Sequence, residues 1–281
     1  MKIVISGSTG LIGRKLSDVL GGMGHRVVGL RRGDFEGDPE LLKEKLKYAG
    51  AVINLAGAPI AGRWSRKYKK EIMDSRTDVT RKLVDAVTSP LMFISASAVG
   101  IYPDGKIADE ECSETAGNFL SEVCLRWEAE AAKLHPDSAL AIMRLGVVLD
   151  KKGGALPKML LPFRLGVGGP IAGGRQGFSW IHIDDLINAF VFVLEHRLAG
   201  TFNLTAPGVT DNLGFSQTLG KVLHRPAVMP LPAFSLKLAF GEGAQVLTVG
   251  QKAVPARLLK AGFTFQFPEA ERALRDLLRK A

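Results

Sequence analysis

Length, composition and charge exclude several classes of protein. The chain has 281 residues, 46% of them hydrophobic, which is enough apolar chain to bury a large core. No apolar run reaches the roughly 18 residues that cross a bilayer, so we expect no membrane partner. The net charge is +9, but the basic residues are dispersed and lack the aromatic interleaving and the motifs of nucleic-acid binding. We therefore expect a globular protein that binds neither nucleic acid nor membrane.

Cysteine usage and the start of the chain predict the compartment. The two cysteines, Cys112 and Cys124, are too few for a disulfide framework or a multi-cysteine metal site. Met1 leads directly into the first apolar run and leaves no room for a signal peptide. We expect a cytoplasmic protein without a metal. The sequence does not fix the oligomeric state, and a homodimer is compatible with it.

The most informative stretch is a glycine-rich run near the start of the chain. Apolar residues 3–5 predict a buried strand, and a helix is predicted over residues 11–23. A glycine-rich loop that leads from a strand into a helix offers backbone amides and the helix dipole to a phosphate group. We predict a dinucleotide-binding loop here; the alternative is a structural turn without a ligand. The residues of this loop are Gly7, Ser8, Thr9, Gly10, Leu11, Ile12 and Gly13.

Each glycine of this loop has its own expected role. Gly7 takes the sharp turn that leaves the strand, and Gly10 lets the backbone approach a pyrophosphate. Gly13 lets the following helix pack closely on the sheet. A side chain at any of the three positions would therefore be expected to interfere with the loop or with its ligand.

The end of the second predicted strand distinguishes the two nicotinamide cofactors. Residues 25–32 predict this strand, which ends in Arg31 and Arg32. Arginine at this position pairs with the extra phosphate of NADP(H), whereas an acidic residue would accept hydrogen bonds from the ribose of NAD(H). NADP(H) is therefore favoured. Two alternatives stay open: the arginines are solvated loop charges, or Asp34 binds the ribose of NAD(H).

Predicted strands and helices alternate along the chain. The further strands are predicted at residues 51–57, 91–97 and 140–149, and the further helices at 67–87 and 119–134. This order predicts an α/β fold, a Rossmann-type doubly wound parallel sheet with a smaller C-terminal lobe. After Asp150 the chain becomes rich in Gly and Pro, with an isolated strand at 201–205. We expect a dinucleotide-binding domain over residues 1–205 and a lobe over 206–281 that completes the substrate side.

Several stretches resemble one protein family. They are residues 7–13, 54–57, 95–97, 180–186 and 202–204. With these motifs the chain resembles the extended and atypical short-chain dehydrogenase/reductases, specifically the nucleotide-sugar epimerase-like group, and its C-terminal segment resembles a little-characterised branch of that group. The resemblance implies that Leu55, Ala56 and Gly57 pack beside the adenine and ribose of the cofactor. It also implies that Arg76 reaches the cofactor; the alternative is an arginine on a helix surface.

The usual catalytic pair of this family is missing from its expected place. The family normally has a tyrosine and a lysine one helical turn apart, where the lysine lowers the pKa of the tyrosine for proton transfer. Tyr102 and Lys106 have this spacing, but a proline and a glycine between them forbid the helical turn. On the helix predicted over 119–134, Leu120 and Cys124 stand at the two positions of the pair. Neither side chain can do the work of the pair.

Two residues remain as candidates for catalysis. Ser97 matches the family's third catalytic position, where a hydroxyl group bonds the substrate, and Tyr102 is the candidate for an unorthodox acid. The alternatives are a serine satisfied at a strand end and a tyrosine packed on the surface. His182 and Asp185 are expected to cap a helix or support the site, and Arg144 to pair with a carboxylate within the fold.

Two classes of function follow from these residues. In the first, the protein is an NADP(H)-dependent oxidoreductase or epimerase that acts on a small polar or nucleotide-sugar-like substrate. In the second, it is a catalytically silent NADP(H)-binding protein that senses redox state or supports an assembly. The first class requires a proton-transfer group near the nicotinamide, and the second requires only a surface that responds to the ligand.

Overall fold

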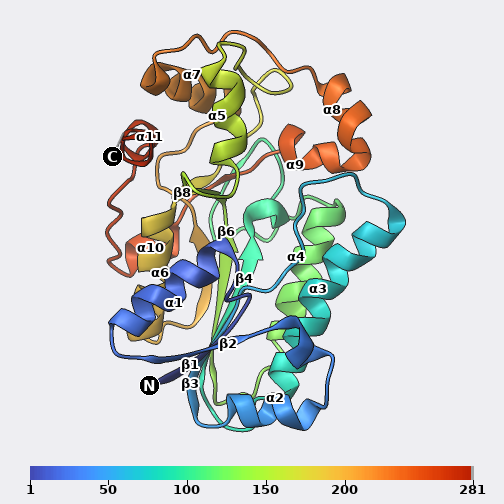
Figure 1. Cartoon of the computed structure of the whole chain (residues 1–281), viewed down its shortest axis with the longest axis vertical. Coiled ribbons are helices and arrows are strands. Elements are labelled where there is room, and N and C mark those ends of the chain that lie inside the picture. The colour runs from blue at the N-terminus through green and yellow to red at the C-terminus, as the bar shows by residue number, and fades with distance from the viewer. Residues whose placement is uncertain (280–281) are drawn as a thin grey trace.

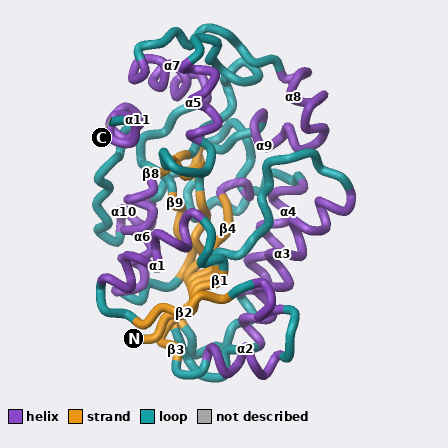
Figure 2. The backbone as a smooth tube through the Cα atoms, in the orientation of Figure 1, coloured by secondary structure: helices purple, strands orange, loops and turns teal. Residues whose placement is uncertain are grey.

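The centre of the molecule is a parallel sheet of six strands (Figure 2). The computed structural model describes residues 1–279; Lys280 and Ala281, the last two residues of the predicted C-terminal lobe, lie outside the described residues. Along the sheet the strand order is β2-β1-β3-β4-β6-β9. The bounds of these strands are β1 (Lys2–Ser6), β2 (Arg26–Leu30), β3 (Ala49–Asn54), β4 (Met92–Ala98), β6 (Ala139–Leu145) and β9 (Gly200–Leu204).

Helices cover both faces of this sheet, as the sequence predicts for a doubly wound fold (Figure 1). Helices α1 and α6 lie on one side, and α3 and α4 lie on the other. The α-helices are α1 (Leu11–Gly22), α2 (Pro39–Leu46), α3 (Arg66–Asp85), α4 (Phe119–Ala131), α5 (Leu156–Arg164), α6 (Ile183–Glu195), α7 (Asn212–Leu223), α8 (Ala233–Phe240), α9 (Gln245–Thr248), α10 (Ala256–Lys260) and α11 (Ala270–Leu278). Short 3₁₀ turns are η1 (Arg32–Phe35), η2 (Val99–Ile101) and η3 (Gly241–Ala244).

The strands are buried on both faces, which explains their nearly continuous apolar sequences. On the α1 side, Ile3 and Ile5 of β1 pack in one core with Leu16 and Phe190 from the covering helices. On the other side, Val4 belongs to a second core together with residues of α2 and α3. This two-sided burial fixes the sheet and leaves the carboxyl ends of its strands at one edge, where a doubly wound fold binds its ligand.

Two strand predictions need correction. The strand expected at residues 201–205 is not isolated, because β9 pairs in parallel with β6 and forms the edge of the central sheet. The run expected at 140–149 forms two strands, β6 and β7 (Val147–Leu149), which separate at Gly146. A Cβ atom at Gly146 would lie 2.7 Å from the Ser179 carbonyl oxygen, so glycine allows the chain to turn there. Strand β7 then pairs with β8 (Trp180–His182), outside the main sheet.

Polar contacts attach the C-terminal part of the chain to the sheet domain. The Asp185 carboxylate, at the start of α6, accepts hydrogen bonds from the amides of Gln266 and Phe267 at 2.8 and 2.9 Å. The Thr205 hydroxyl donates to the Ala253 carbonyl oxygen in β10 (Lys252–Ala253), which pairs with β5 (Ile107–Ala108). Because these contacts cross residue 205, the boundary between residues 1–205 and 206–281 stays a prediction. No helix in residues 1–279 is long and apolar enough to cross a bilayer.

Candidate functional site

The glycine-rich loop has the geometry of a phosphate cradle. Gly7 follows β1 with a φ of +69°, a left-handed conformation that glycine adopts without strain. Gly10 is the N-cap of α1 and has no side chain to bond the free amides of the first turn. No acidic residue lies in that turn, so the positive end of the helix dipole is not neutralised within the loop. These amides are therefore available to an anionic ligand.

Space around the glycines supports the roles expected for them. A Cβ atom at Gly13 would lie 2.2 Å from the Gly7 carbonyl oxygen, and one at Gly7 would lie 2.8 Å from the backbone of Leu55. Both positions exclude side chains because the backbone packs closely there. A Cβ atom at Gly10 would have only the Gly7 oxygen as a neighbour, at 3.2 Å. Gly10 and Thr9 are exposed, as the surface of a ligand-binding loop must be.

Beyond β2, the arginines and the acidic residue have different environments. The side chains of Arg31 and Arg32 are exposed, and Arg32 pairs with Glu36 at 3.0 Å. The Asp34 carboxylate accepts a hydrogen bond from the Arg31 amide at 2.7 Å and pairs with Lys45 at 2.5 Å. Partial burial acts to raise the pKa of Asp34, but Lys45 and the amide outweigh it and hold the pKa below its usual value. Both Asp34 oxygens and the Arg32 side chain are thus engaged within the chain, and the role of the arginines in binding a cofactor phosphate stays a prediction.

A buried asparagine shapes the loop after β3. Asn54 accepts a hydrogen bond from the Ser6 hydroxyl at 2.6 Å and donates to the Thr80 hydroxyl at 2.7 Å. The Leu55 amide in turn donates to the Ser6 hydroxyl oxygen at 3.2 Å. Asn54 thus ties the ends of β1 and β3 to α3. The loop that contains Leu55, Ala56 and Gly57 is held close to Gly7 of the glycine-rich loop, and its packing beside the adenine and ribose stays a prediction.

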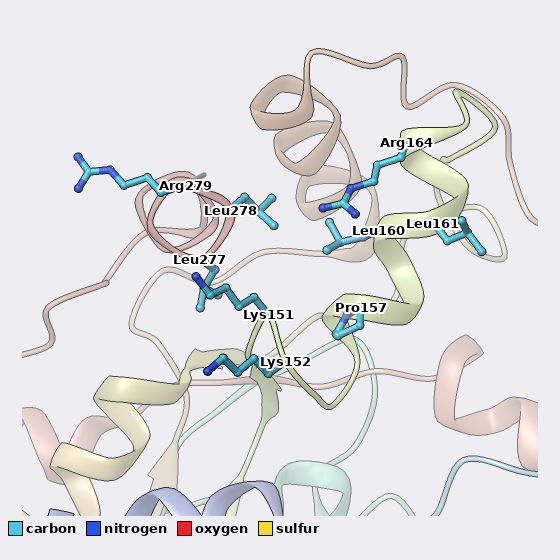
Figure 3. A pocket seen from close by; sticks show the side chains of 9 residues that line it. All are labelled: Lys151, Lys152, Pro157, Leu160, Leu161, Arg164, Leu277, Leu278 and Arg279. Atoms are coloured by element: carbon cyan, nitrogen blue, oxygen red, sulfur yellow. The ribbon is translucent and has the colours of Figure 1, made fainter. Parts of the chain in front are cut away.

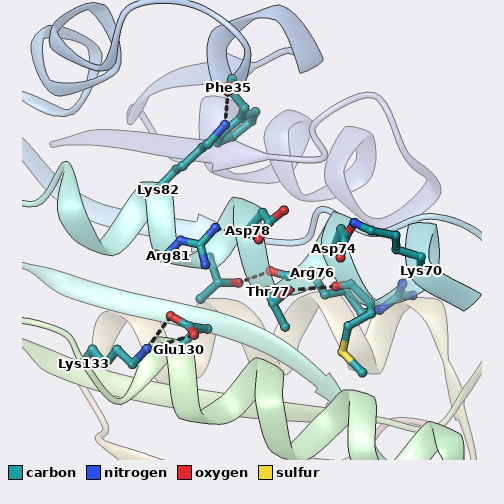
Figure 4. A network of polar contacts seen from close by, with 12 residues as sticks. Phe35, Lys70, Asp74, Arg76, Thr77, Asp78, Arg81, Lys82, Glu130 and Lys133 are labelled. Atoms are coloured by element: carbon teal, nitrogen blue, oxygen red, sulfur yellow. Dashed lines mark hydrogen bonds and ion pairs between the residues drawn. The ribbon is translucent and has the colours of Figure 1, made fainter.

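Arg76 lies on α3 (Figure 4). Its guanidinium group donates to the carbonyl oxygens of Ala58 and Ile72, at 3.0 and 2.9 Å, and lies over the Trp127 ring. A Cβ atom at Gly57 would lie 3.0 Å from the Arg76 Cζ atom. Burial lowers the pKa of Arg76, which has no ion pair within residues 1–279. The structure shows Arg76 supporting the loop; direct contact with a cofactor stays a prediction.

A charged network lies at the carboxyl ends of β4 and β6. The Ser97 hydroxyl donates to the Glu128 carboxylate of α4 at 2.6 Å. Arg144 of β6 binds the same carboxylate through two hydrogen bonds, of 2.8 and 2.7 Å. Burial acts to lower the pKa of Arg144, but the Glu128 carboxylate outweighs it and raises the pKa. The expected carboxylate partner of Arg144 is confirmed, and the same carboxylate accepts the hydrogen bond of Ser97.

Tyr102 belongs to the same network and does not pack on the surface. Only 1% of the residue is exposed, and its hydroxyl group lies 2.8 Å from Arg144 Nη1 and donates to Asn203 Oδ1 at 2.9 Å. Burial raises the pKa of Tyr102, and Arg144 only partly opposes the shift. The surface location is therefore wrong. The Tyr102 hydroxyl group is buried and already hydrogen-bonded to Arg144 and Asn203, so it is poorly placed to donate a proton to a substrate. Lys106 is bound to Glu114 at 2.7 Å, so it forms no catalytic pair with Tyr102.

Asn203 and Glu110 extend the network into the C-terminal part of the chain. The Asn203 side chain donates to the Val254 carbonyl oxygen at 2.9 Å. The Glu110 carboxylate accepts hydrogen bonds from the amides of Asn203 and Arg257, at 2.8 and 3.1 Å. Sequence reasoning missed Glu110, because its acidic neighbours resemble a solvated loop. Asn203 occurs in one of the family-like stretches, which was the only signal for it.

The positions of the missing catalytic pair are apolar. Cys124 on α4 is buried, and its thiol lies 3.6 Å from the Ala98 carbonyl oxygen at the end of β4. Leu120, one turn earlier, packs over Gly100, where a Cβ atom would lie 3.8 Å from that of Leu120. The helix therefore faces the strand end as the resemblance implies, without a hydroxyl or ammonium group at these two positions.

The environment of Cys124 makes a prediction about thiol reactivity. Burial and the nearby Glu128 raise the pKa of the Cys124 thiol to about 11, and only the thiolate form reacts with disulfide reagents. At pH 8 we expect Ellman's reagent to modify Cys112 alone in the native protein. The Cys112→Ser variant should then show no rapid reaction until it is unfolded in urea. Rapid modification of native Cys112→Ser at pH 8 would contradict the buried environment.

The structure places His182 and two acidic residues close together. His182 is the N-cap of α6, as expected, and its Nδ1 atom accepts the Asp184 amide at 3.0 Å. Ligand atoms of His182, Asp184 and Asp276 lie within 4.8 Å of one another. The Lys15 ammonium group forms an ion pair with Asp184 at 2.7 Å, so one carboxylate of this cluster already has a cationic partner within the chain. The expected absence of a metal site stays a prediction.

Comparison with known proteins places these features in a family. Residues 3–205 match the model of the NAD dependent epimerase/dehydratase family, and residues 231–277 match a domain of unknown function, DUF1731. The chain belongs to the NAD dependent epimerase/dehydratase family. This membership confirms the epimerase-like resemblance, including its distinctive C-terminal segment.

Individual relatives agree over nearly the whole chain. The mouse epimerase family protein SDR39U1 is 39% identical, with 99% of this chain and 100% of the relative covered. A chloroplastic SDR39U1 homologue of Arabidopsis thaliana is also 39% identical, over 99% of this chain and 87% of the relative. The crystal structure of human SDR39U1 with NADPH superimposes with a TM-score of 0.91 at 35% identity, covering 99% of both chains.

Proposed function

We propose that this protein binds NADPH at the carboxyl edge of its sheet, with the pyrophosphate on the loop between Gly7 and Gly13. The observation that carries this proposal is the cradle itself: a left-handed Gly7, an uncapped α1 and close backbone packing at Gly13. The NADPH in the human relative supports the same assignment. Leu55, Ala56 and Gly57 would line the adenosine half, and Arg31 and Arg32 would receive the phosphate that distinguishes NADPH from NADH.

We further propose that the protein is an oxidoreductase or epimerase that acts on a small polar or nucleotide-sugar-like substrate. When bound, the cofactor supplies hydride chemistry, and the chain must supply the proton handling. Ser97 and Glu128 are the residues suited to this task, because the Ser97 hydroxyl donates to Glu128 at 2.6 Å. Arg144 orients the carboxylate through two hydrogen bonds. Tyr102 is assigned a positioning role through Arg144.

A second function is favoured by a different observation. The positions of the family's tyrosine and lysine hold Leu120 and Cys124, which provide no proton relay, and the Glu128 carboxylate is already bound by Arg144. A catalytically silent NADPH-binding protein that senses redox state or supports an assembly would have no use for that relay. The two functions differ in whether Ser97 and Glu128 matter for turnover.

Cofactor preference tests the first proposal. We expect NADPH to bind more tightly than NADH by about tenfold or more, because a hydrogen bond to a charged group contributes roughly 1.5–3 kcal/mol. The double variant Arg31→Ala/Arg32→Ala should lose most of this preference and retain its NADH affinity. Calorimetric titration of both cofactors measures the two affinities. Equal affinities in the native protein, or a preference that survives in the variant, would contradict the assignment.

Turnover separates the two functions. Across a panel of ketone, aldehyde and nucleotide-sugar substrates, an enzyme should show NADPH-dependent conversion that falls about 100-fold or more in Ser97→Ala, because acid–base catalysis contributes at least that much. Tyr102→Phe, measured on the folded protein, should change kcat far less. If the native protein and Ser97→Ala are equally inert while both bind NADPH, the silent binding protein is the better account.

Location and assembly are not decided by these observations. The expected cytoplasmic location stays a prediction, since the Arabidopsis relative is described as chloroplastic. A small-molecule substrate is part of the proposal above, and a homodimer stays compatible with the sequence.

A further inference from the structure

A basic groove lies away from the proposed cofactor loop, between α5, α7 and α11. It consists of two adjoining cavities of about 530 and 710 Å³, which share Arg164, Leu278 and Arg279 (Figure 3). We call the pair the α5–α11 groove. Each volume lies in the range of small-molecule sites.

The lining of this groove combines an apolar surface with cationic side chains. The apolar residues of the first cavity are Pro157, Leu160, Leu161, Leu277 and Leu278. Its cationic residues are Lys151, Lys152, Arg164 and Arg279, and the second cavity adds the cations Arg225 and Arg275 and the imidazole of His224. Neither cavity is lined by an acidic residue or by Phe, Tyr or Trp. The groove is therefore complementary to an anion that also carries apolar surface.

Cations at the first cavity are accessible and not neutralised. Within residues 1–279, Lys151, Lys152 and Arg164 form no ion pair. The nearby Asp150 carboxylate accepts the Lys152 amide at 2.6 Å and lies 3.9 Å from Lys15, so it does not serve these side chains. Figure 3 shows Arg164 of α5 extending toward α11. An anionic group placed there would gain ion pairs without breaking existing ones.

We propose that the α5–α11 groove binds an anionic amphiphile, a single alkyl or acyl chain with a carboxylate or phosphate head group. The leucines of α5 and α11 would contact the chain, and burial of its methylene groups would favour binding. Arg164 and Lys151 would bind the head group. A nucleotide fits the first cavity less well, because that cavity has no aromatic side chain to stack on a base. An inorganic anion would leave the apolar surface unused.

The α5–α11 groove is separate from the glycine-rich loop, but the loop that carries Lys151 and Lys152 contacts the start of α1. Cβ atoms at Gly153 and Gly154 would lie 3.0 and 3.5 Å from the side chain of Leu11, the first residue of α1. The loop that carries Lys151 and Lys152 therefore rests on the start of the phosphate-binding helix. Amphiphile binding does not depend on the proposed NADPH site, so the two can be measured separately on one protein.

Calorimetric titration of the full chain with dodecyl phosphate and dodecanoate, each below its critical micelle concentration, tests the proposal. We expect one molecule bound per chain and at least tenfold weaker binding in Arg164→Glu and in Leu278→Asn. The variant Lys151→Glu/Lys152→Glu should also bind more weakly. Because both residues lie in an exposed loop, this variant tests the proposal even if Arg164→Glu or Leu278→Asn fails to fold. Lys260→Glu, on exposed α10, changes the charge by the same amount as Arg164→Glu and should bind normally. Circular dichroism and NADPH titration report whether each variant keeps its fold.

Four outcomes would overturn the proposal. Inorganic phosphate that binds as tightly as dodecyl phosphate would show that the apolar surface contributes nothing. Dodecyltrimethylammonium that binds equally well would show that the cations contribute nothing. Unchanged affinity in folded Arg164→Glu and in folded Lys151→Glu/Lys152→Glu would place the ligand elsewhere. Binding to phosphatidylglycerol vesicles without binding to either monomeric amphiphile would indicate a membrane surface instead of a ligand site.

Discussion

Replacing Gly13 with alanine is expected to weaken NADPH binding about 100-fold or more. The new Cβ atom would lie 2.2 Å from the Gly7 carbonyl oxygen and 2.7 Å from Ser8 Cα, so α1 and the loop must move apart. A displaced loop loses its charge-assisted hydrogen bonds to the pyrophosphate, and two such bonds contribute about 3 kcal/mol or more. Overpacking should also lower the free energy of unfolding by roughly 1–3 kcal/mol. Calorimetry and urea denaturation measure the two effects.

Two other glycines provide matched comparisons for Gly13. Gly10→Val should keep the fold and lose NADPH binding, because its side chain would face only the Gly7 oxygen and the ligand's side of the loop. Gly21→Ala, on the same helix, meets nothing within 4 Å; it should bind NADPH normally and be more stable by roughly 0.5–1 kcal/mol. If Gly13→Ala binds NADPH as tightly as Gly21→Ala, the cofactor does not occupy this loop.

The cofactor half of the site could be predicted from sequence because its signals are local. Gly7, Gly10 and Gly13 lie within one strand–loop–helix unit, and their spacing specifies both the turn and the helix start. The same holds for Arg31 and Arg32, which directly follow β2. The conformation of such a short segment depends on residues that are adjacent in the sequence, so the sequence alone can predict it. The strands were recognised for a similar reason, since burial on both faces leaves a continuous apolar run.

The other half of the site depends on contacts between distant parts of the chain. Tyr102 is followed by Pro103, Asp104 and Gly105, a sequence typical of an exposed loop. Its burial comes from partners 42 and 101 residues away, Arg144 and Asn203. The sequence alone cannot specify such pairings. It could indicate that Arg144 needed a carboxylate, because a charged residue inside a buried strand is costly without one.

Glu110 and the C-terminal attachments show the same limit. Glu110 is 8% exposed, and its carboxylate accepts hydrogen bonds from two backbone amides. Such bonds to the backbone cannot be read from the identity of the residues that donate them. Gly146 was also overlooked inside an apolar run, although it separates β6 from β7. Both errors arise because close backbone approach is a property of the assembled fold. The substrate side of the molecule, which is built from such contacts, is therefore the part for which experiments are most informative.

Removal of the buried Glu128 carboxylate is expected to cost more stability than removal of the exposed Glu122 carboxylate on the same helix. Only 16% of the Glu128 side chain and 12% of the Arg144 side chain are exposed, so Glu128→Ala leaves an uncompensated charge in a poorly solvated place. The loss should be about 3–5 kcal/mol in the free energy of unfolding. Ser97 loses its acceptor at the same time. Urea denaturation followed by circular dichroism measures the change.

The exposed pair of Glu122 and Arg126 on the same helix provides the control. Its side chains are 52% and 64% exposed, so Glu122→Ala should cost no more than about 1 kcal/mol. The double variant Glu128→Leu/Arg144→Met removes both buried charges and should be more stable than Glu128→Ala, because no unpaired ion remains. Equal losses in Glu128→Ala and Glu122→Ala would mean that water reaches the Arg144 guanidinium. In that case Arg144 would not hold Glu128 in place, and the pairing of Ser97 with Glu128 would lose its physical basis.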